Sequence, residues 1–260
     1  MRTRSPHSSP GGRHELGQNF LVHTPTIDQL AGLVARTDGA ILEIGAGDGA
    51  LTSRLALLGR DLTAIDIDER RIAGLRRRMP AVRVEHADVL RHPLDKPVIV
   101  GNVPYHLTTP ILRRLLERPH WQQAILLTQW EVARKRAGVG GGTMMTAQAA
   151  PWFEFALHGR VPAHRFRPVP SVDGGILSIT RRGSPLVPLD ERRAYDRFVR
   201  DVFTARGHGL LAIVQGVTGR PRSSVTRAFA GLGIDPAGLP RGLSAEQWAA
   251  LWQELGERPM

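Results

Sequence analysis

The fold of this chain is indicated first by residues 40–49, which read AILEIGAGDG. The first five of these residues are apolar except for Glu43, which is typical of a short strand buried on both faces of a sheet. Glycines then alternate with other residues, and the apolar residues of 51–58 recur with a helical period. A strand, a glycine turn and a helix in succession predict the first unit of a parallel α/β sheet.

The alternation of strand and helix continues outward from this unit. A helix is predicted to begin at Thr24, with proline at its second residue. Further strands are predicted at residues 62–66, 82–86, 98–100 and 124–127, with helices at 68–78 and 108–116. A terminal strand pair is predicted at residues 153–157 and 175–179. The fold class is therefore α/β, with a doubly wound, mostly parallel seven-stranded sheet.

The strand signal ends near Gly183. Beyond it the sequence predicts short helices at residues 195–205, 210–217, 223–230 and 245–255, with Ser244 as the N-cap of the last. We therefore expect three parts: a disordered basic tail over residues 1–13, the sheet domain over 14–183, and a small all-helical C-terminal domain over 184–260.

Composition excludes several chemistries. The chain has 260 residues and no cysteine, so disulfides, thiolate zinc sites and cysteine nucleophiles are excluded. The histidines show no metal-ligand spacing, and no apolar run is long enough to span a membrane. The N-terminus lacks the apolar segment of a signal peptide, so we expect a cytoplasmic protein. The net charge of +11 favours a nucleic-acid partner, although arginine richness also fits a GC-rich genome.

A cofactor site is predicted at the ends of the first three strands. Gly45 and Gly47 belong to a GxGxG turn, which alone is a weak signal. Asp66 ends the second strand, where a carboxylate can accept both ribose hydroxyls, and Asp88 follows the third, where it can accept the amine of an adenine ring. Two carboxylates would repel a diphosphate but suit a cationic nucleoside such as S-adenosylmethionine. An NAD-dependent enzyme is the main alternative.

The fourth strand ends in Asn102-Val103-Pro104-Tyr105, which indicates the reaction. The side-chain oxygen of Asn102 and the carbonyl of Pro104 can accept the N–H groups of an adenine N6 amine and aim its lone pair at a methyl sulfonium. Tyr105 can stack on the base, a contact worth about 1–3 kcal/mol. Read alone, the same four residues would also fit a turn with a half-buried tyrosine.

From about Gly17 to Arg182 the chain resembles the ribosomal RNA adenine N6-methyltransferase family. Residues 17–21, GQNFL, resemble the N-terminal cofactor motif of that family, which implies Gln18, Asn19 and Leu21 as cofactor contacts. Residues 166–173, FRPVPSVD, match its FxPxPxVD signature, which implies a role on the target-base side. The resemblance implies S-adenosylmethionine as cofactor, and the catalytic and cofactor positions named above match its motifs.

Two branches of this family share the pattern. Val103 and the pair Gly174-Gly175 resemble the Erm type, which implies mono- or dimethylation of one adenine in 23S rRNA and resistance to macrolides, lincosamides and streptogramin B. The alternatives left open are a KsgA-type 16S rRNA dimethyltransferase, a relative that methylates DNA adenine, and a non-catalytic RNA-binding relative. We expect a monomer.

Two basic groups are candidates for binding RNA. The first follows the fifth strand and precedes the glycine-rich loop 138–142, and the second flanks the target-base side. They comprise Arg134, Lys135 and Arg136 in the first group, and Arg165, Phe166 and Arg167 in the second. A solvated basic surface remains an alternative for both.

Overall fold

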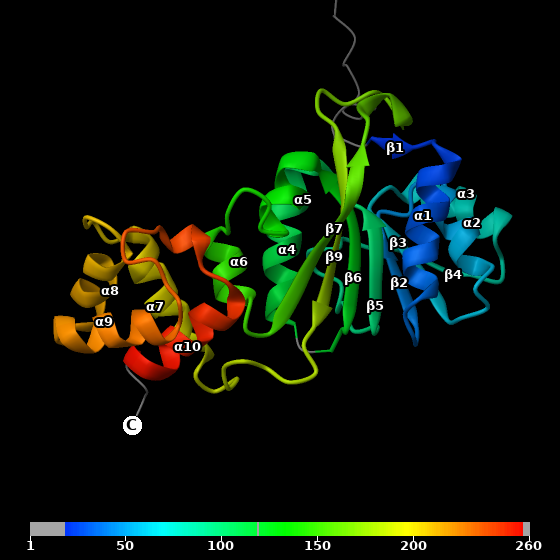
Figure 1. Cartoon of the computed structure of the whole chain (residues 1–260). Helices are drawn as coiled ribbons and strands as arrows, with labels where there is room; N and C mark the ends of the chain where they lie inside the picture. The colour runs from blue at the N-terminus through cyan, green and yellow to red at the C-terminus, as the bar shows by residue number, and fades with distance from the viewer. Residues whose placement is uncertain (1–18, 119, 257–260) are drawn as a thin grey trace, which may run out of the picture.

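The computed structural model describes residues 19–118 and 120–256, so the predicted basic tail and Gln18 lie outside the described residues. One sheet of seven strands has the order β4-β3-β2-β5-β6-β9-β7 (Figure 1). Its first five strands in chain order are β2 Ile41–Ile44, β3 Leu62–Asp66, β4 Arg83–His86, β5 Val98–Asn102 and β6 Gln123–Gln129. All pairings among these five are parallel, which confirms the predicted fold class.

The remaining two strands complete one edge of the sheet. β9, Gly174–Arg181, pairs antiparallel with both β6 and β7, Phe153–Val161. The predicted terminal strand pair is therefore confirmed, and both strands are longer than predicted. A separate two-stranded sheet, which the sequence did not predict, joins β1, Phe20–Leu21, to β8, Phe166–Arg167.

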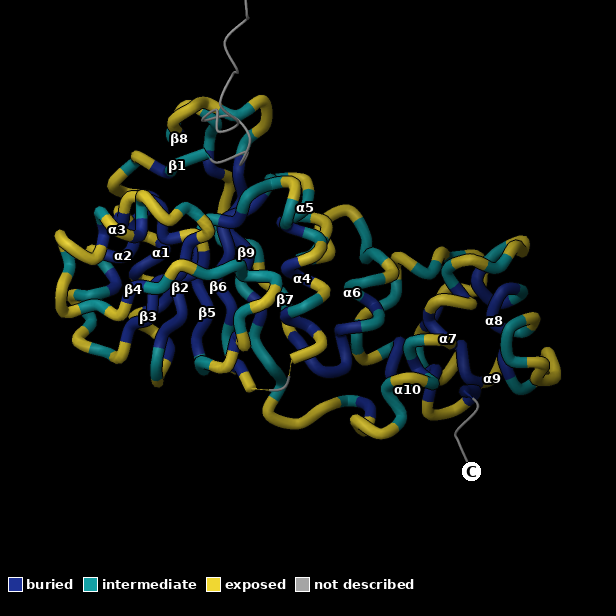
Figure 2. Tube along the Cα trace, turned by 180° about the vertical axis from the view of Figure 1, so that it is seen from behind, coloured by how far each residue is buried: buried dark blue, intermediate teal, exposed yellow. Residues whose placement is uncertain are grey.

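Helices cover both faces of the sheet. The side chains of Val98 and Val100 pack with the helices α1, Thr24–Ala35, and α2, Ala50–Ala56, whereas Ile99 packs with α4, Thr108–Glu117. This alternation is the reason why the strands are apolar at nearly every position. Figure 2 shows the inner strands β2, β3 and β5 buried, whereas the surrounding loops are more exposed. The helix α3, Glu69–Arg78, packs against β3 and β4, and Asp68 caps it.

The chain order creates a switch point between β2 and β5. The chain moves outward from β2 to β4 and then returns to the other side of β2, so the loops after β2 and β5 leave in opposite directions. Ile44 pairs with Gly101 across this junction. A Cβ on Gly101 would lie 2.1 Å from the Ile44 carbonyl oxygen, so this close approach of the backbones requires glycine.

Two short helices connect β6 to β7. They are α5, Trp130–Arg136, and α6, Met144–Ala149. The short helix α6 was not predicted from the sequence. The glycine-rich loop between the two helices is tied to the C-terminal region, because the Gly142 amide donates to the Arg241 carbonyl at 2.7 Å.

The C-terminal region is helical, as predicted. It contains α7 Arg192–Thr204, α8 Leu210–Thr218, α9 Arg222–Gly231 and α10 Ala245–Leu255. Ser244 caps α10 in a capping box with Gln247. The core continues from the sheet into these helices: Tyr195 packs edge-on against Trp152 at 5.5 Å and donates its hydroxyl to the Ala147 carbonyl at 2.9 Å.

The domain boundary after residue 183 stays a prediction, since one apolar core spans both sides of it. Within residues 19–118 and 120–256, no helix combines the length and the apolar character needed to cross a membrane.

Candidate active site

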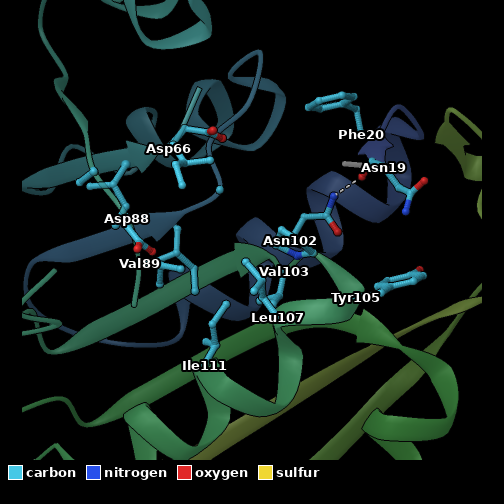
Figure 3. A pocket seen from close by; sticks show the side chains of 16 residues that line it. Asn19, Phe20, Asp66, Asp88, Val89, Asn102, Val103, Tyr105, Leu107 and Ile111 are labelled. Atoms are coloured by element: carbon cyan, nitrogen blue, oxygen red, sulfur yellow. Dashed lines mark hydrogen bonds between the residues drawn. The ribbon is translucent and has the colours of Figure 1, made fainter. Parts of the chain in front are cut away.

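A pocket opens at the carboxyl edge of the sheet, beside the switch point between β2 and β5. Figure 3 shows Asp66 and Asp88 on one side of it, Asn102 at its centre and Tyr105 on the other side. Parallel strands place these residues together because each follows or ends a neighbouring strand. The structure thus brings together most of the polar residues that the sequence predicted.

Asp66 is oriented by the glycine turn. The Gly47 amide donates to its Oδ2 at 2.8 Å and the Asp68 amide donates to its Oδ1 at 2.9 Å. Gly45 and Gly47 have φ angles of 70° and 53°, a left-handed conformation that glycine adopts without steric cost. Each oxygen of the buried carboxylate keeps a lone pair, so Asp66 can still accept a pair of ribose hydroxyls.

Asp88 lies beside an apolar wall. Its Oδ1 accepts the Leu90 amide at 2.8 Å, which orients the carboxyl group. The apolar side chains that line the pocket between Asp88 and the catalytic tetrapeptide are those of Val89, Val103, Leu107 and Ile111. A carboxylate at the rim of a flat apolar slot is suited to an adenine ring with an exocyclic amine.

The Asn102 side chain has a defined orientation. Its Nδ2 donates to the main-chain carbonyl oxygen of Asn19 at 2.6 Å, which leaves the Oδ1 atom as an acceptor (Figure 3). The strand β1 holds Asn19 in place by pairing with β8 on the target-base side. Asn102 can therefore accept an N–H group of a bound amine without reorientation.

Pro104 directly precedes a short helical turn, and its role in catalysis stays a prediction. Its carbonyl oxygen already accepts the Leu107 amide at 2.9 Å, because a 3₁₀ turn, Tyr105–Leu107, begins directly after it. The Thr108 hydroxyl donates to the same oxygen at 3.5 Å. Val103, the residue before it, also lines the pocket. The carbonyls of Val103 and Pro104 are both candidates for the second acceptor.

Tyr105 is half-buried, and its hydroxyl has no hydrogen-bond partner among residues 19–118 and 120–256. Burial raises the pKa of this phenol to about 12, and the negative charge of Asp173 acts in the same direction. The hydroxyl reaches the end of the FxPxPxVD segment, because a Cβ on Gly174 would lie 3.3 Å from it. Tyr105 is therefore a neutral aromatic group at neutral pH.

Asp173 connects two segments on the target-base side of the site. Its Oδ1 accepts the Ala163 amide at 2.8 Å and its Oδ2 pairs with Arg160 at 2.6 Å. The hydrogen bond from Ala163 lowers the pKa of this carboxyl group, and Arg160 lowers it further. Asp173 thus fastens the turn after β7 to the start of β9.

Three of the predicted contacts lie in surroundings that the sequence did not indicate, and their roles stay predictions. Phe166 has no exposed surface and packs in the core, so its ring cannot stack on RNA in this structure. Leu21 is 7% exposed and packs in the same core cluster; it lines a neighbouring pocket with Gly45 and Asn102 rather than the pocket beside Asp66. Gly47 supports the site through Asp66 and does not itself line this pocket.

The predicted basic residues lie in different environments. Arg134 pairs with Glu131 at 2.9 Å, and Arg136 donates to Thr143 at 2.6 Å. Lys135 and Arg167 are exposed, and Arg165 donates to Thr26 at 3.1 Å. Their contact with RNA stays a prediction, and Lys135 and Arg167 are the most accessible of the five.

Sequence reasoning missed two aromatic residues beside the site. Phe20 lines the pocket, and the Arg71 guanidinium lies 4.0 Å from its ring centroid. Trp130 begins α5 at the carboxyl end of β6. Trp130 could have been found from its position shortly after a predicted strand. For Phe20, the sequence offered no signal beyond its place in the motif at residues 17–21. In the described ranges, no cluster of three or more His, Asp or Glu side chains could hold a metal ion.

The sheet order and the polar pocket at its switch point define the class of the protein: it has the Rossmann-like fold of methyltransferases, with a site suited to a nucleoside cofactor. Comparison with known proteins identifies the family. The family model "Ribosomal RNA adenine dimethylase" matches residues 11–255. The chain therefore belongs to this family and is an rRNA adenine N6-methyltransferase.

Individual relatives place the chain in the Erm branch. It is 53% identical over 208 residues to an rRNA adenine N-6-methyltransferase of Corynebacterium diphtheriae, covering 78% of this chain and 82% of the relative. It is 48% identical to the mycinamicin-resistance protein MyrB of Micromonospora griseorubida, covering 96% and 82%. The crystal structure of the 23S rRNA methyltransferase ErmE superposes with a TM-score of 0.83 at 33% identity, covering 91% and 99%. The predicted Erm-type resemblance is confirmed.

Proposed function

We propose that this protein uses S-adenosylmethionine to methylate the N6 amine of an adenine in 23S rRNA. One observation carries the proposal: the hydrogen bond from Asn102 to the Asn19 carbonyl presents the free amide oxygen to the pocket, three residues before the Tyr105 ring. An acceptor and an aromatic face at the carboxyl edge of β5 suit a flat base with an exocyclic amine.

The residues present fit an S-adenosyl cofactor. Asp66 would hold the ribose, Asp88 would accept the adenine amine, and the apolar wall of Val89 and Ile111 would take the ring. Within the described residues, Asp66 and Asp88 give the pocket lining a negative charge, which favours a cationic ligand over a diphosphate. When bound, the cofactor supplies an electrophilic methyl group.

The chain's own residues act by orientation. The Asn102 Oδ1 and a main-chain carbonyl of the tetrapeptide accept the two N–H groups, which turns the amine lone pair out of conjugation. Tyr105 packs on the base and excludes water. No general base is needed before attack, since the neutral amine carries the lone pair; the proton is lost to solvent afterwards. Tyr105 does not serve as a base, because its pKa of about 12 keeps the hydroxyl protonated.

The 23S target and drug resistance are inferred from the relatives. MyrB is described as a mycinamicin-resistance protein and ErmE as a 23S rRNA methyltransferase. We infer that methylation of one adenine, once or twice, confers resistance to macrolides, lincosamides and streptogramin B. The protein acts as a monomer in the cytoplasm, where it meets rRNA.

The test is methyl transfer from labelled S-adenosylmethionine to naked 23S rRNA and to small ribosomal subunits in parallel. We expect label in 23S rRNA alone, at a single adenine mapped by primer extension. The Asn102→Ala variant serves as the inactive control. Label confined to the small subunit would overturn the 23S assignment.

A further inference from the structure

Trp130 begins α5 directly after β6, the strand that pairs with β5. Its amide donates to the Asp173 carbonyl at 2.9 Å, and its ring rests on Gly175, where a Cβ would lie 3.2 Å from a ring carbon. The same added Cβ would lie 2.8 Å from the Cβ of Ala133. Glycine at position 175 therefore makes room for the indole beside β9.

Arg160 covers this indole from the solvent side. Its guanidinium carbon lies 5.6 Å from the Trp130 ring centroid, and its Nε pairs with Asp173 Oδ2 at 2.6 Å. The Arg160 side chain nevertheless remains 59% exposed. The ring and the carboxylate already restrict the Arg160 side chain, yet its planar guanidinium remains accessible. Binding a ligand there would therefore cost little further side-chain entropy.

Asp173 connects this pair to the residue that faces Tyr105. Asp173, which fixes Arg160, is followed by Gly174, whose Cβ position is 3.3 Å from the Tyr105 hydroxyl. In the sheet, Gln129 pairs with Gly174, and Leu127 pairs with Asn102. Arg160 lies on β7 and Asn102 ends β5; both strands belong to one sheet, in which β9 and β6 lie between them.

We propose that Arg160, stacked on Trp130, is a binding platform for an unpaired base that flanks the target adenine. Methylation at N6 requires the target base to leave its stack, which exposes the faces of its neighbours. Guanidinium planes and aromatic rings are the groups on which proteins stack such bases. Because Asp173 already neutralises much of the Arg160 charge, a stacking contact is favoured over a phosphate contact.

This inference rests on one part of the proposed function, namely that the substrate is an adenine in RNA. The test therefore uses a hairpin from whichever rRNA the wild type methylates, 23S or 16S. Failure of the 23S assignment would then leave the test of the platform intact.

The experiment combines Arg160→Lys with abasic substitutions at each nucleotide within three positions of the target. Lysine keeps the charge and loses the plane, so we expect KM for the hairpin to rise about tenfold with kcat within about twofold. At one flanking position, removal of the base should raise the KM of the wild type by a similar factor. The same abasic RNA should not raise the KM of Arg160→Lys any further.

Arg54→Lys is the matched control, since Arg54 is also exposed and pairs with Asp28 at 2.9 Å without an aromatic partner. It should leave KM unchanged. A KM for Arg160→Lys equal to that of the wild type would contradict the proposal. So would increases in KM from the variant and from the abasic RNA that multiply at every position. As a second readout, 2-aminopurine at the identified position should be quenched by the wild type and not by Arg160→Lys.

Discussion

The side-chain amide of Asn102 donates to the main-chain carbonyl of Asn19 at 2.6 Å, across 83 positions of the chain. This bond connects the end of β5 to β1, and β1 in turn pairs with β8 of the FxPxPxVD segment. The Asn19 carbonyl therefore links the cofactor motif to the catalytic residue Asn102. The pairing of β1 with β8 links the same motif to the target-base side. The orientation of the catalytic oxygen depends on this connection.

Asn102→Asp should abolish most methyl transfer. The carboxylate has no N–H for the Asn19 carbonyl, and loss of a partner for a buried acceptor costs about 1–3 kcal/mol, or roughly 5- to 150-fold. Single-turnover methylation of rRNA measures the effect. Asn19→Ala is the control, because it keeps the carbonyl: it should weaken cofactor binding and spare the methyl-transfer rate. Equal single-turnover losses in the two variants would contradict this role of the bond.

Replacement of Tyr105 should separate its ring from its hydroxyl. Tyr105→Phe removes a hydroxyl without a recorded partner in the described chain, so we expect activity within about threefold of the wild type and the same pH profile up to pH 10. Tyr105→Ala removes the stacking surface and should lower kcat/KM roughly 10- to 100-fold while cofactor affinity persists. The measurements are steady-state kinetics and calorimetric binding of the cofactor. A large loss for Tyr105→Phe would show that the hydroxyl has a chemical role.

Gly174→Ala and Gly175→Ala should have different effects. At position 175 the new methyl lies 2.8 Å from the Cβ of Ala133, and overpacking of this kind costs about 1–3 kcal/mol of stability. At position 174 the contacts are 3.1 Å or more, one of them with the Tyr105 hydroxyl, so activity should fall more than stability. Urea unfolding and methylation assays compare the two.

Gly183→Ala is the control for both, since nothing lies within 4 Å of a Cβ there. It should change neither quantity measurably. A Gly175→Ala variant as stable as the wild type would contradict the tight seat of Trp130.

The sequence predicted those parts of the fold whose signal is local. Alternation of apolar runs with helical periods located all seven strands of the main sheet, and the polar residue at the end of each run located Asp66, Asp88 and Asn102. Parallel topology alone brings such strand ends together. No comparable local signal marks α6, which is only six residues long.

The parts that were missed depend on long-range pairing. The two-residue strands β1 and β8 are too short to show a period, yet they pair with each other and carry the buried residues Leu21 and Phe166. The contact between the Trp130 ring and Gly175 likewise depends on how β6 pairs with β9. A short sequence motif contains no information about that pairing. For Pro104, the prediction did not include the 3₁₀ turn that uses its carbonyl.

Glu43 should make stability depend on pH. It is 2% exposed in β2, and its Oε2 has no hydrogen-bond partner among the described residues. Burial raises the pKa of this carboxyl group from 4.5 to about 8, and the charge of Asp66 acts in the same direction. Below pH 4.5 both folded and unfolded states are protonated. Between pH 4.5 and 8 only the unfolded state loses the proton, so the free energy of unfolding falls as pH rises.

The expected slope approaches about 1.4 kcal/mol per pH unit in that window and flattens above pH 8. Glu43→Gln cannot ionise, so its stability relative to the wild type should grow from pH 5 to pH 8. Urea unfolding at pH 5, 6, 7 and 8 measures the difference. Glu117→Gln, on the exposed face of α4, should show no such trend. A constant difference between wild type and Glu43→Gln would mean that Glu43 is ionised in the folded protein throughout this range.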